Sequence, residues 1–219
     1  EQKRGLKIKT LFSEDKGTQG MIEYITGENC WRPVNAEGYL FIHCLFVGFK
    51  KEFKNRGYAG ELIESTIKEA GEEGYKGVAA VTRKGSFMTG KEIYLKHGFK
   101  ECDTAKPDFQ VMALNFDKTG DLSKFNEYVN AAGQYGEKVT ILRAFQCPYT
   151  VKNVAEMVEA GKKEFGIDVN VVDLKKCSDA QKNPSPFGTF ALIVNGKVCA
   201  YHPVSCTRFR NILKKEIDY

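Results

Sequence analysis

The sequence predicts a mixed α/β chain built from two unlike domains. Residues 39–47 are nearly all apolar, and a basic glycine loop and an amphipathic helix follow them. From residue 138 a different pattern begins: a strand, a helix, a strand, a hairpin and a last helix. Hydrophobic residues make up 42% of the 219 positions and charged residues 28%, which supplies apolar cores and argues against disorder.

In the first half, alternating apolar and polar residues predict a strand at 6–12. Residues 39–47 predict a central strand that is buried on both faces. Apolar residues recur at helical spacing from 59 to 70, and the glycines at 71 and 74 end that helix. The other elements expected here are strands at 21–25, 78–81 and 109–114 and a short helix around 91–96.

In the second half, the polar, glycine-interrupted stretch 117–137 is expected to be a connector with one short helix. Asn195-Gly196 predicts a hairpin turn. The elements expected here are strands at 139–144, 168–174, 190–194 and 198–201 and helices at 151–165 and 207–216. We therefore expect one domain over residues 1–116 and a second over residues 138–219.

Composition excludes several classes of protein. The net charge of +5 is not concentrated in a basic patch, which argues against nucleic-acid binding. The seven cysteines form neither a CxxC pair nor a Cys/His cluster, so we expect no metal site and reduced thiols in a cytoplasm. No apolar run reaches the roughly 20 residues of a membrane span. Because the chain begins at Glu1 rather than Met, a targeting segment ahead of it stays open.

The loop after the central strand is suited to an anion. It runs Lys54-Asn55-Arg56-Gly57-Tyr58-Ala59-Gly60 and leads into the helix. A helix N-terminus presents N–H groups and a positive dipole end to a phosphate. Gly57 and Ala59 allow close approach, and Lys54 and Arg56 add charge. A pyrophosphate cradle is therefore one interpretation, and a helix cap with solvated lysines is the other.

This loop resembles the signature Q/R-x-x-G-x-G/A of the GNAT acetyltransferases, with Lys54 where Gln or Arg is usual. About 35 residues later, Tyr94-Leu95-Lys96-His97-Gly98-Phe99 is similar to the later motif of that family. The likeness covers residues 5–116, where the N-terminal strand and helices of the family are not evident. The loop is also about two residues longer than usual. The resemblance implies a GNAT mixed sheet that binds acetyl-CoA.

In that family two neighbouring parallel strands splay apart around the thioester. The resemblance implies that pantetheine bonds to the backbone at Leu45, Phe46 and Val47, and that Tyr94 is the acid that protonates the CoA thiolate. His43 is the candidate base, because an imidazole titrates near neutral pH, and alternation would place it on the face of Phe41, Leu45 and Val47. A packing role for Tyr94 and a core position for His43 stay open.

Four further residues are weaker candidates. Glu23 and Tyr24 can supply acceptor contacts or a base that acts through water, or they can belong to a solvated strand face. Trp31 and Pro33 can line an acceptor channel or serve ordinary packing.

The second domain carries Phe145-Gln146-Cys147-Pro148-Tyr149-Thr150 between a strand and a helix. Thioredoxin-like proteins place a reactive Cys at such a junction, where the helix dipole lowers the thiol pKa. Cys-Pro-Tyr resembles glutaredoxins, but Thr150 replaces the second Cys. This half resembles the YoaP-type C-terminal domain of some bacterial GNAT proteins. Cys147 is a monothiol site or an inert thiol, and the prolines at 184 and 186 lie where that fold has a cis-proline.

The preferred function is transfer of an acetyl group from acetyl-CoA to a primary amine by direct attack. The acceptor is a small molecule or a peptide, and the resemblance implies a cytoplasmic, bacterial enzyme. The sequence leaves a homodimer open. One alternative is a monothiol glutaredoxin-like or thiol-binding protein centred on Cys147 with a degenerate CoA-binding domain, and another is a CoA sensor without activity.

Overall fold

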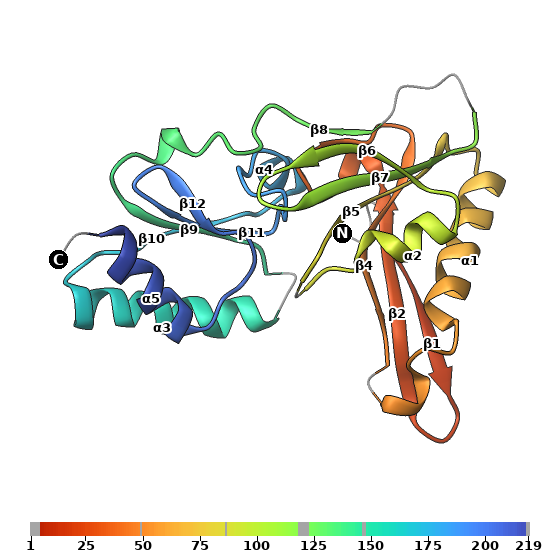
Figure 1. The fold of residues 1–219 in the computed structure, drawn as a ribbon, viewed down its shortest axis with the longest axis horizontal. Coiled ribbons are helices and arrows are strands. Elements are labelled where there is room, and N and C mark those ends of the chain that lie inside the picture. Colours follow the sequence, from red (N-terminus) through yellow and green to blue (C-terminus); the bar gives the residue numbers. More distant parts are fainter. Residues whose placement is uncertain (1–4, 49, 86, 118–122, 146–147, 218–219) are drawn as a thin grey trace. The chain divides into compact units, whose positions relative to one another are not determined.

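The computed structural model describes residues 5–48, 50–85, 87–117, 123–145 and 148–217, and only the backbone of Pro148 and Tyr149 (Figure 1). It has a mixed α/β fold, as the sequence predicts. The chain divides into two compact units. The first unit comprises Glu1–Cys30 and Val34–Phe125, and the second comprises Trp31–Pro33 and Asn126–Tyr219.

The first unit is built on a six-stranded sheet in the order β1-β2-β4-β5-β7-β6. Its strands are β1 (Lys7–Ser13), β2 (Gly17–Thr26), β4 (Tyr39–Val47), β5 (Gly77–Arg83), β6 (Lys100–Ala105) and β7 (Phe109–Asn115). β4 and β5 pair in parallel, and the other neighbours pair antiparallel. A parallel pair needs a crossover, which helix α1 (Tyr58–Glu72) supplies between β4 and β5.

The core of the first unit lies between this sheet and the helices α1 and α2 (Lys91–Lys96). Alternate residues of the strands, such as Ile22, Leu40 and Ile42, pack against Leu62 and Ile63 of α1. Figure 1 shows α1 alongside the long strands β1 and β2. Helical periodicity in the sequence therefore identified the face of α1 that is buried.

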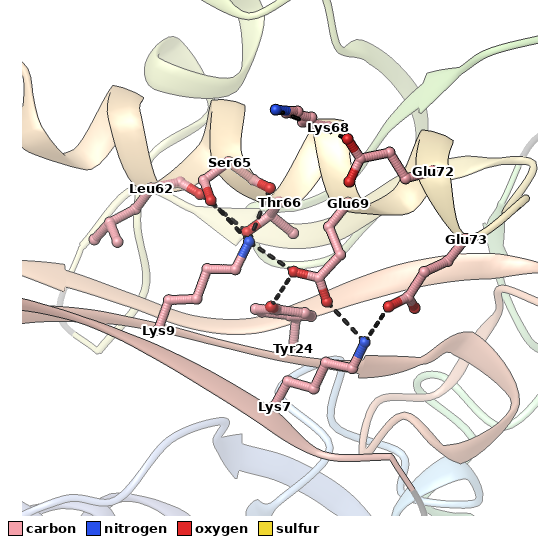
Figure 2. Close-up of polar contacts among 10 residues, drawn as sticks. All are labelled: Lys7, Lys9, Tyr24, Leu62, Ser65, Thr66, Lys68, Glu69, Glu72 and Glu73. Atoms are coloured by element: carbon pink, nitrogen blue, oxygen red, sulfur yellow. Dashed lines mark hydrogen bonds and ion pairs between the residues drawn. The ribbon is translucent and has the colours of Figure 1, made fainter.

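A polar network ties the β1–β2 hairpin to α1 (Figure 2). Oε1 of Glu69 accepts a hydrogen bond from Lys7 Nζ at 2.7 Å, and Oε2 accepts from the Tyr24 hydroxyl at 2.8 Å and lies 2.7 Å from Lys9 Nζ. Lys7 also reaches Glu73 at 2.5 Å. Burial alone would raise the pKa of Glu69, but the hydrogen bonds from the two lysines and Tyr24 outweigh it and lower the pKa to about 2.

The second unit contains a four-stranded sheet in the order β10-β9-β11-β12. Its strands are β9 (Val139–Arg143), β10 (Asn170–Asp173), β11 (Phe190–Val194) and β12 (Lys197–Ala200), and its helices are α3 (Pro148–Phe165), α4 (Cys177–Gln181) and α5 (Cys206–Glu216). β9 and β10 are parallel, whereas β11 runs antiparallel to both β9 and β12. Asn195, at φ 50°, forms the predicted hairpin turn with Gly196.

Sequence periodicity did not predict every element. β6 was not expected, because its sequence KECDTA has little apolar character. In the stretch expected to hold a short helix, the described residues contain strand β8 (Lys124–Phe125), which pairs with β3 (Val34–Asn35), and a 3-10 turn at Gly133–Tyr135. The described part of the chain has one cis peptide bond, before Pro107, so the expectation of a cis-proline at 184 or 186 was wrong.

Candidate active site

Strands β4 and β5 part halfway along their length. Their pairing runs from Tyr39–Gly77 to Ile42–Ala80, although β4 continues to Val47 and β5 to Arg83. Beyond Ile42, β4 keeps its other edge on β2, where Leu45 pairs with Ile22 and Val47 with Gly20. The edge of Leu45, Phe46 and Val47 that faces β5 is therefore not part of the β4–β5 ladder.

A β-bulge marks the point where the two strands part. On β2, Glu23 pairs with Cys44 and Tyr24 with Ile42, which makes His43 the extra residue of β4. The bulge reverses the alternation of side chains, because Leu45 and Val47 pack in the same core as Leu40 and Ile42. The expectation that His43 shares the face of Leu45 and Val47 was therefore wrong.

His43 contacts Glu23 on the face of the sheet opposite to α1. The Nδ1 atom of His43 lies 3.3 Å from Oε1 of Glu23, and the two side chains are 4% and 22% exposed. The ring of Phe41 meets the imidazole edge-on, with centroids 5.6 Å apart. Tyr24, the next residue of β2, points the other way and bonds to Glu69, so Tyr24 belongs neither to an acceptor site with Glu23 nor to a solvated face.

The predicted phosphate loop ends in the first turn of α1. Gly57 is the N-cap residue at φ 86°, a left-handed conformation that favours glycine. Asn55 is also left-handed, at φ 58°. Among the described residues no side chain caps this helix, so its first N–H groups and the dipole face out of the turn. Both the geometry and the charge of this end are suited to an anion.

The basic residues of this loop lie on its outer part. Arg56 donates from Nε to the carbonyl of Glu52 at 3.3 Å. Lys54 crosses Gly48, where a Cβ would stand 2.5 Å from Cγ of Lys54, so a side chain at position 48 would displace Lys54. Lys16, from the β1–β2 turn, forms an ion pair with Glu52 of the same loop.

Tyr94 lies in helix α2 with 3% of its surface exposed, and its ring meets Phe99 edge-on at 5.2 Å. Burial raises the pKa of the Tyr94 hydroxyl, and the neighbouring Cys44 of β4 raises it further. The hydroxyl is thus held protonated beside the strand that parts from β5. Tyr94 therefore packs in the core against Phe99 and also lies near β4, where the predicted site is.

Two residues of this region were missed or undervalued from the sequence. The Thr89 hydroxyl donates to the carbonyl of Leu45 at 3.2 Å, which ties the loop before α2 to β4. No periodicity marks a loop threonine of this kind. From the sequence, Glu23 was only a weaker candidate, because a single sequence gives little sign of the β-bulge beside which Glu23 contacts His43.

Trp31 and Pro33 belong to the second unit by their packing. Trp31 is 4% exposed in the apolar core that contains Leu142 and Ile193. The carbonyl of Pro33 accepts from the Asn126 amide at 3.0 Å. These interactions account for both residues as packing and favour that alternative over an acceptor channel.

Cys147 lies outside the described residues. Among its described neighbours, Phe145 is 57% exposed and Thr150 is buried. The Arg143 guanidinium lies over the Phe145 ring, 5.0 Å from its centroid, and bonds to Asp173 at 2.7 Å. In the described ranges no group of His, Cys, Asp and Glu is arranged to hold a metal ion, and no helix is long and apolar enough to cross a membrane.

Comparison with known proteins shows what this chain resembles. Residues 169–211 match the YoaP-like family model. Over 97% of its length the chain is 27% identical to the uncharacterized N-acetyltransferase YoaP of Bacillus subtilis (strain 168), of which it covers 86%. The name of this relative agrees with the enzyme class that the sequence predicts, an acetyltransferase.

Among solved structures, the chain resembles the PaiA N-acetyltransferase of Thermoplasma acidophilum, solved with coenzyme A, at 20% identity and a TM-score of 0.40. That match covers 51% of this chain and 62%, less than two thirds, of the other. A GNAT-family acetyltransferase from Staphylococcus aureus Mu50 matches at 18% identity over 53% of this chain and 71% of the other, with a TM-score of 0.42. Both likenesses are partial at these TM-scores.

Proposed function

We propose that this chain transfers an acetyl group from acetyl-CoA to a primary amine. The parting of β4 and β5 after the Ile42–Ala80 pair carries the proposal. The open N-terminus of α1 lies on one face of the sheet at this point, and the Glu23–His43 pair lies on the other. A cofactor and an acceptor approaching from opposite faces would meet where the strands part.

Acetyl-CoA supplies the activated acyl group. Its pyrophosphate binds the loop Lys54-Asn55-Arg56-Gly57-Tyr58-Ala59-Gly60 at the helix N-terminus. Its pantetheine arm extends along the backbone of Leu45, Phe46 and Val47, on the edge that β5 leaves. The Thr89 hydroxyl already bonds to the Leu45 carbonyl on this edge, and the backbone of Val47, two residues along, faces the same edge.

The reaction needs a base and an acid. His43 takes a proton from the acceptor ammonium, and the resulting amine attacks the thioester carbonyl carbon. A nitrogen–carbon bond forms, the nitrogen of the tetrahedral adduct loses its second proton to solvent, and collapse of the adduct breaks the carbon–sulfur bond. The thiolate receives a proton from the Tyr94 hydroxyl, and Tyr94 is reprotonated from solvent.

For the second unit we propose a thioredoxin-like fold. The order β10-β9-β11-β12, with a helix between the parallel strands and a terminal helix after the hairpin, supports it. Domain limits of 1–116 and 138–219 with a connector at 117–137 stay predictions, as do the homodimer, the cytoplasmic location and the bacterial origin. None of the described residues favours the thiol function of Cys147 over the acetyltransferase.

Calorimetric titration of acetyl-CoA into the chain tests the proposal. We expect a dissociation constant in the micromolar range, and Arg56→Glu weakens binding by at least tenfold because it places an anion in the cradle. Lys100→Glu makes the same charge change on exposed β6 and leaves affinity unchanged. Absence of binding to the unmodified chain would overturn the proposal.

A further inference from the structure

An apolar stripe lies beside the Glu23–His43 pair on the same face of the sheet. We define the stripe as Ile8, Met21 and Phe46, one residue from each of β1, β2 and β4. Ile8 is 53% exposed and Phe46 is 40% exposed. Large apolar side chains with such exposure, gathered on three consecutive strands of the sheet, indicate a binding surface.

Strand register brings the stripe together. Met21 stands opposite both Thr10 of β1 and Phe46 of β4, and Ile8 stands opposite Glu23. Directly paired residues have Cβ atoms roughly 5 Å apart, so Met21 is the immediate neighbour of Phe46, and Ile8 lies diagonally across from Met21. Met21 and Glu23 are two residues apart on β2 and share one face, because Ile22 and Tyr24 point into the core beneath α1.

The β-bulge determines that Phe46 belongs to this face. Without it, Phe46 would share the side of Leu40 and Ile42. With it, Leu45 and Val47 turn into the core and Phe46 turns to the side of Met21. The same backbone irregularity therefore brings Phe46 onto the face that already holds His43 and Glu23.

Charge complementarity identifies the occupant. A carboxylate and an imidazole adjoin an apolar surface, an arrangement that is complementary to an ammonium group joined to an apolar body. The inference rests on the proposed function, since it concerns the acceptor of that same reaction. We infer that the acceptor is a primary amine on an apolar or aromatic body, which packs against Ile8, Met21 and Phe46 while its ammonium group meets Glu23 and His43.

The geometry also distinguishes amine classes. A polar amine would gain the contact with Glu23 but leave the stripe in water. An arylalkyl amine would gain both, because burial of its ring against the stripe removes apolar surface from water. The stripe therefore lowers KM for apolar amines and has little effect on the chemical step.

The experiment measures CoA release from acetyl-CoA with 2-phenylethylamine and with ethanolamine as acceptors. We expect a kcat/KM at least tenfold higher for 2-phenylethylamine. Ile8→Ser and Met21→Ser raise its KM by about tenfold, equivalent to about 1.4 kcal/mol, with kcat within a factor of two. Val172→Ser, which removes an apolar side chain of 37% exposure from the second unit, is the matched control and leaves both constants unchanged.

Several outcomes would overturn the inference. One is equal use of the two amines, and another is a preference that both stripe variants retain in full. Failure to use either amine by a chain that binds acetyl-CoA would also overturn it while sparing the cofactor site. Absence of acetyl-CoA binding would instead remove the proposed function. Sedimentation of the same variants tests whether a second copy of the chain occupies the stripe instead. If Ile8→Ser converts a dimer to a monomer and KM is unchanged, the stripe joins two copies of the chain and the inference is overturned.

Discussion

The imidazole of His97 fills the space where a side chain of Gly60 would begin. A Cβ built on Gly60 would lie 2.9 Å from Nε2 of His97 and 3.1 Å from its Cε1. The opposite ring nitrogen, Nδ1, lies 3.3 Å from Oε1 of Glu64, one helical turn further along α1. The end of α2 is thereby fitted to the first turn of α1, and a side chain at position 60 would have to displace the His97 ring.

This contact predicts non-additive stability changes at positions 60 and 97. In a helix, Gly→Ala normally gains roughly 0.5–1 kcal/mol, but at Gly60 the new methyl group must displace the His97 ring. We expect Gly60→Ala to gain little or to destabilise the wild-type chain, and to gain the full amount once His97→Ala has removed the ring. Urea denaturation of the four chains measures both increments.

Gly71→Ala is the matched control, because it lies in the same helix and the nearest atom to its added Cβ, in Phe116, is 3.9 Å away. It should stabilise both backgrounds equally. An identical gain from Gly60→Ala with and without His97 would show that the ring does not restrict position 60.

A second prediction concerns acid stability. The folded-state pKa of Glu69, about 2, lies below its ordinary value of 4.5, so ionised Glu69 stabilises the fold above pH 4.5. That stabilisation is lost as pH falls from about 4.5 to about 2 and the carboxylate is protonated. A full shift corresponds to about 3 kcal/mol, and solvent screening of the partly exposed lysines reduces our expectation to about 1–2 kcal/mol.

Glu69→Gln should therefore lose about 1–2 kcal/mol at pH 7 and show a flatter dependence of unfolding free energy between pH 4.5 and 2. Chemical denaturation at a series of pH values measures this. Glu72→Gln, whose carboxylate is 65% exposed and 3.8 Å from Lys68, should change little. Parallel pH profiles for wild type and Glu69→Gln would mean that the network adds no ionisation-linked stability.

The glycine loop that contains Gly60 could be predicted from the sequence, whereas the network around Glu69 could not. The glycine loop, the bounds of β4 and α2, and the buried face of α1 follow from local patterns, and these were predicted. The bulge at His43 depends on how β2 and β4 pair. The network at Glu69 depends on Tyr24 and Lys7, which precede it by 45 and 62 positions in the sequence. Alternation in one strand carries no information on either, so Leu45 and Val47 were wrongly placed on the face of His43.

A third prediction tests His43 as the base. His43→Gln should lower kcat by about 10²-fold or more, the usual contribution of a positioned base, while acetyl-CoA affinity stays unchanged because the cradle lies on the other face. His202→Gln, in the second unit, is the control for a general effect of losing a histidine. Release of CoA in the presence of 2-phenylethylamine measures kcat. An unaltered kcat in His43→Gln would return His43 to the role of a core residue.

The fourth prediction separates the two roles of Tyr94. Tyr94→Phe keeps the ring against Phe99 and removes only the hydroxyl, so we expect the acetyl-CoA dissociation constant to stay constant and kcat to fall by about 10²-fold. Tyr39→Phe deletes another buried hydroxyl, one that donates to Asn115 at 2.7 Å, and should affect stability but not kcat. Because burial raises the pKa of Tyr94 above its ordinary value of 10, this residue stays protonated as pH rises, and kcat should show no loss from its ionisation up to pH 10. Full turnover in Tyr94→Phe would leave the packing role as its whole function and would require another donor for the departing thiolate.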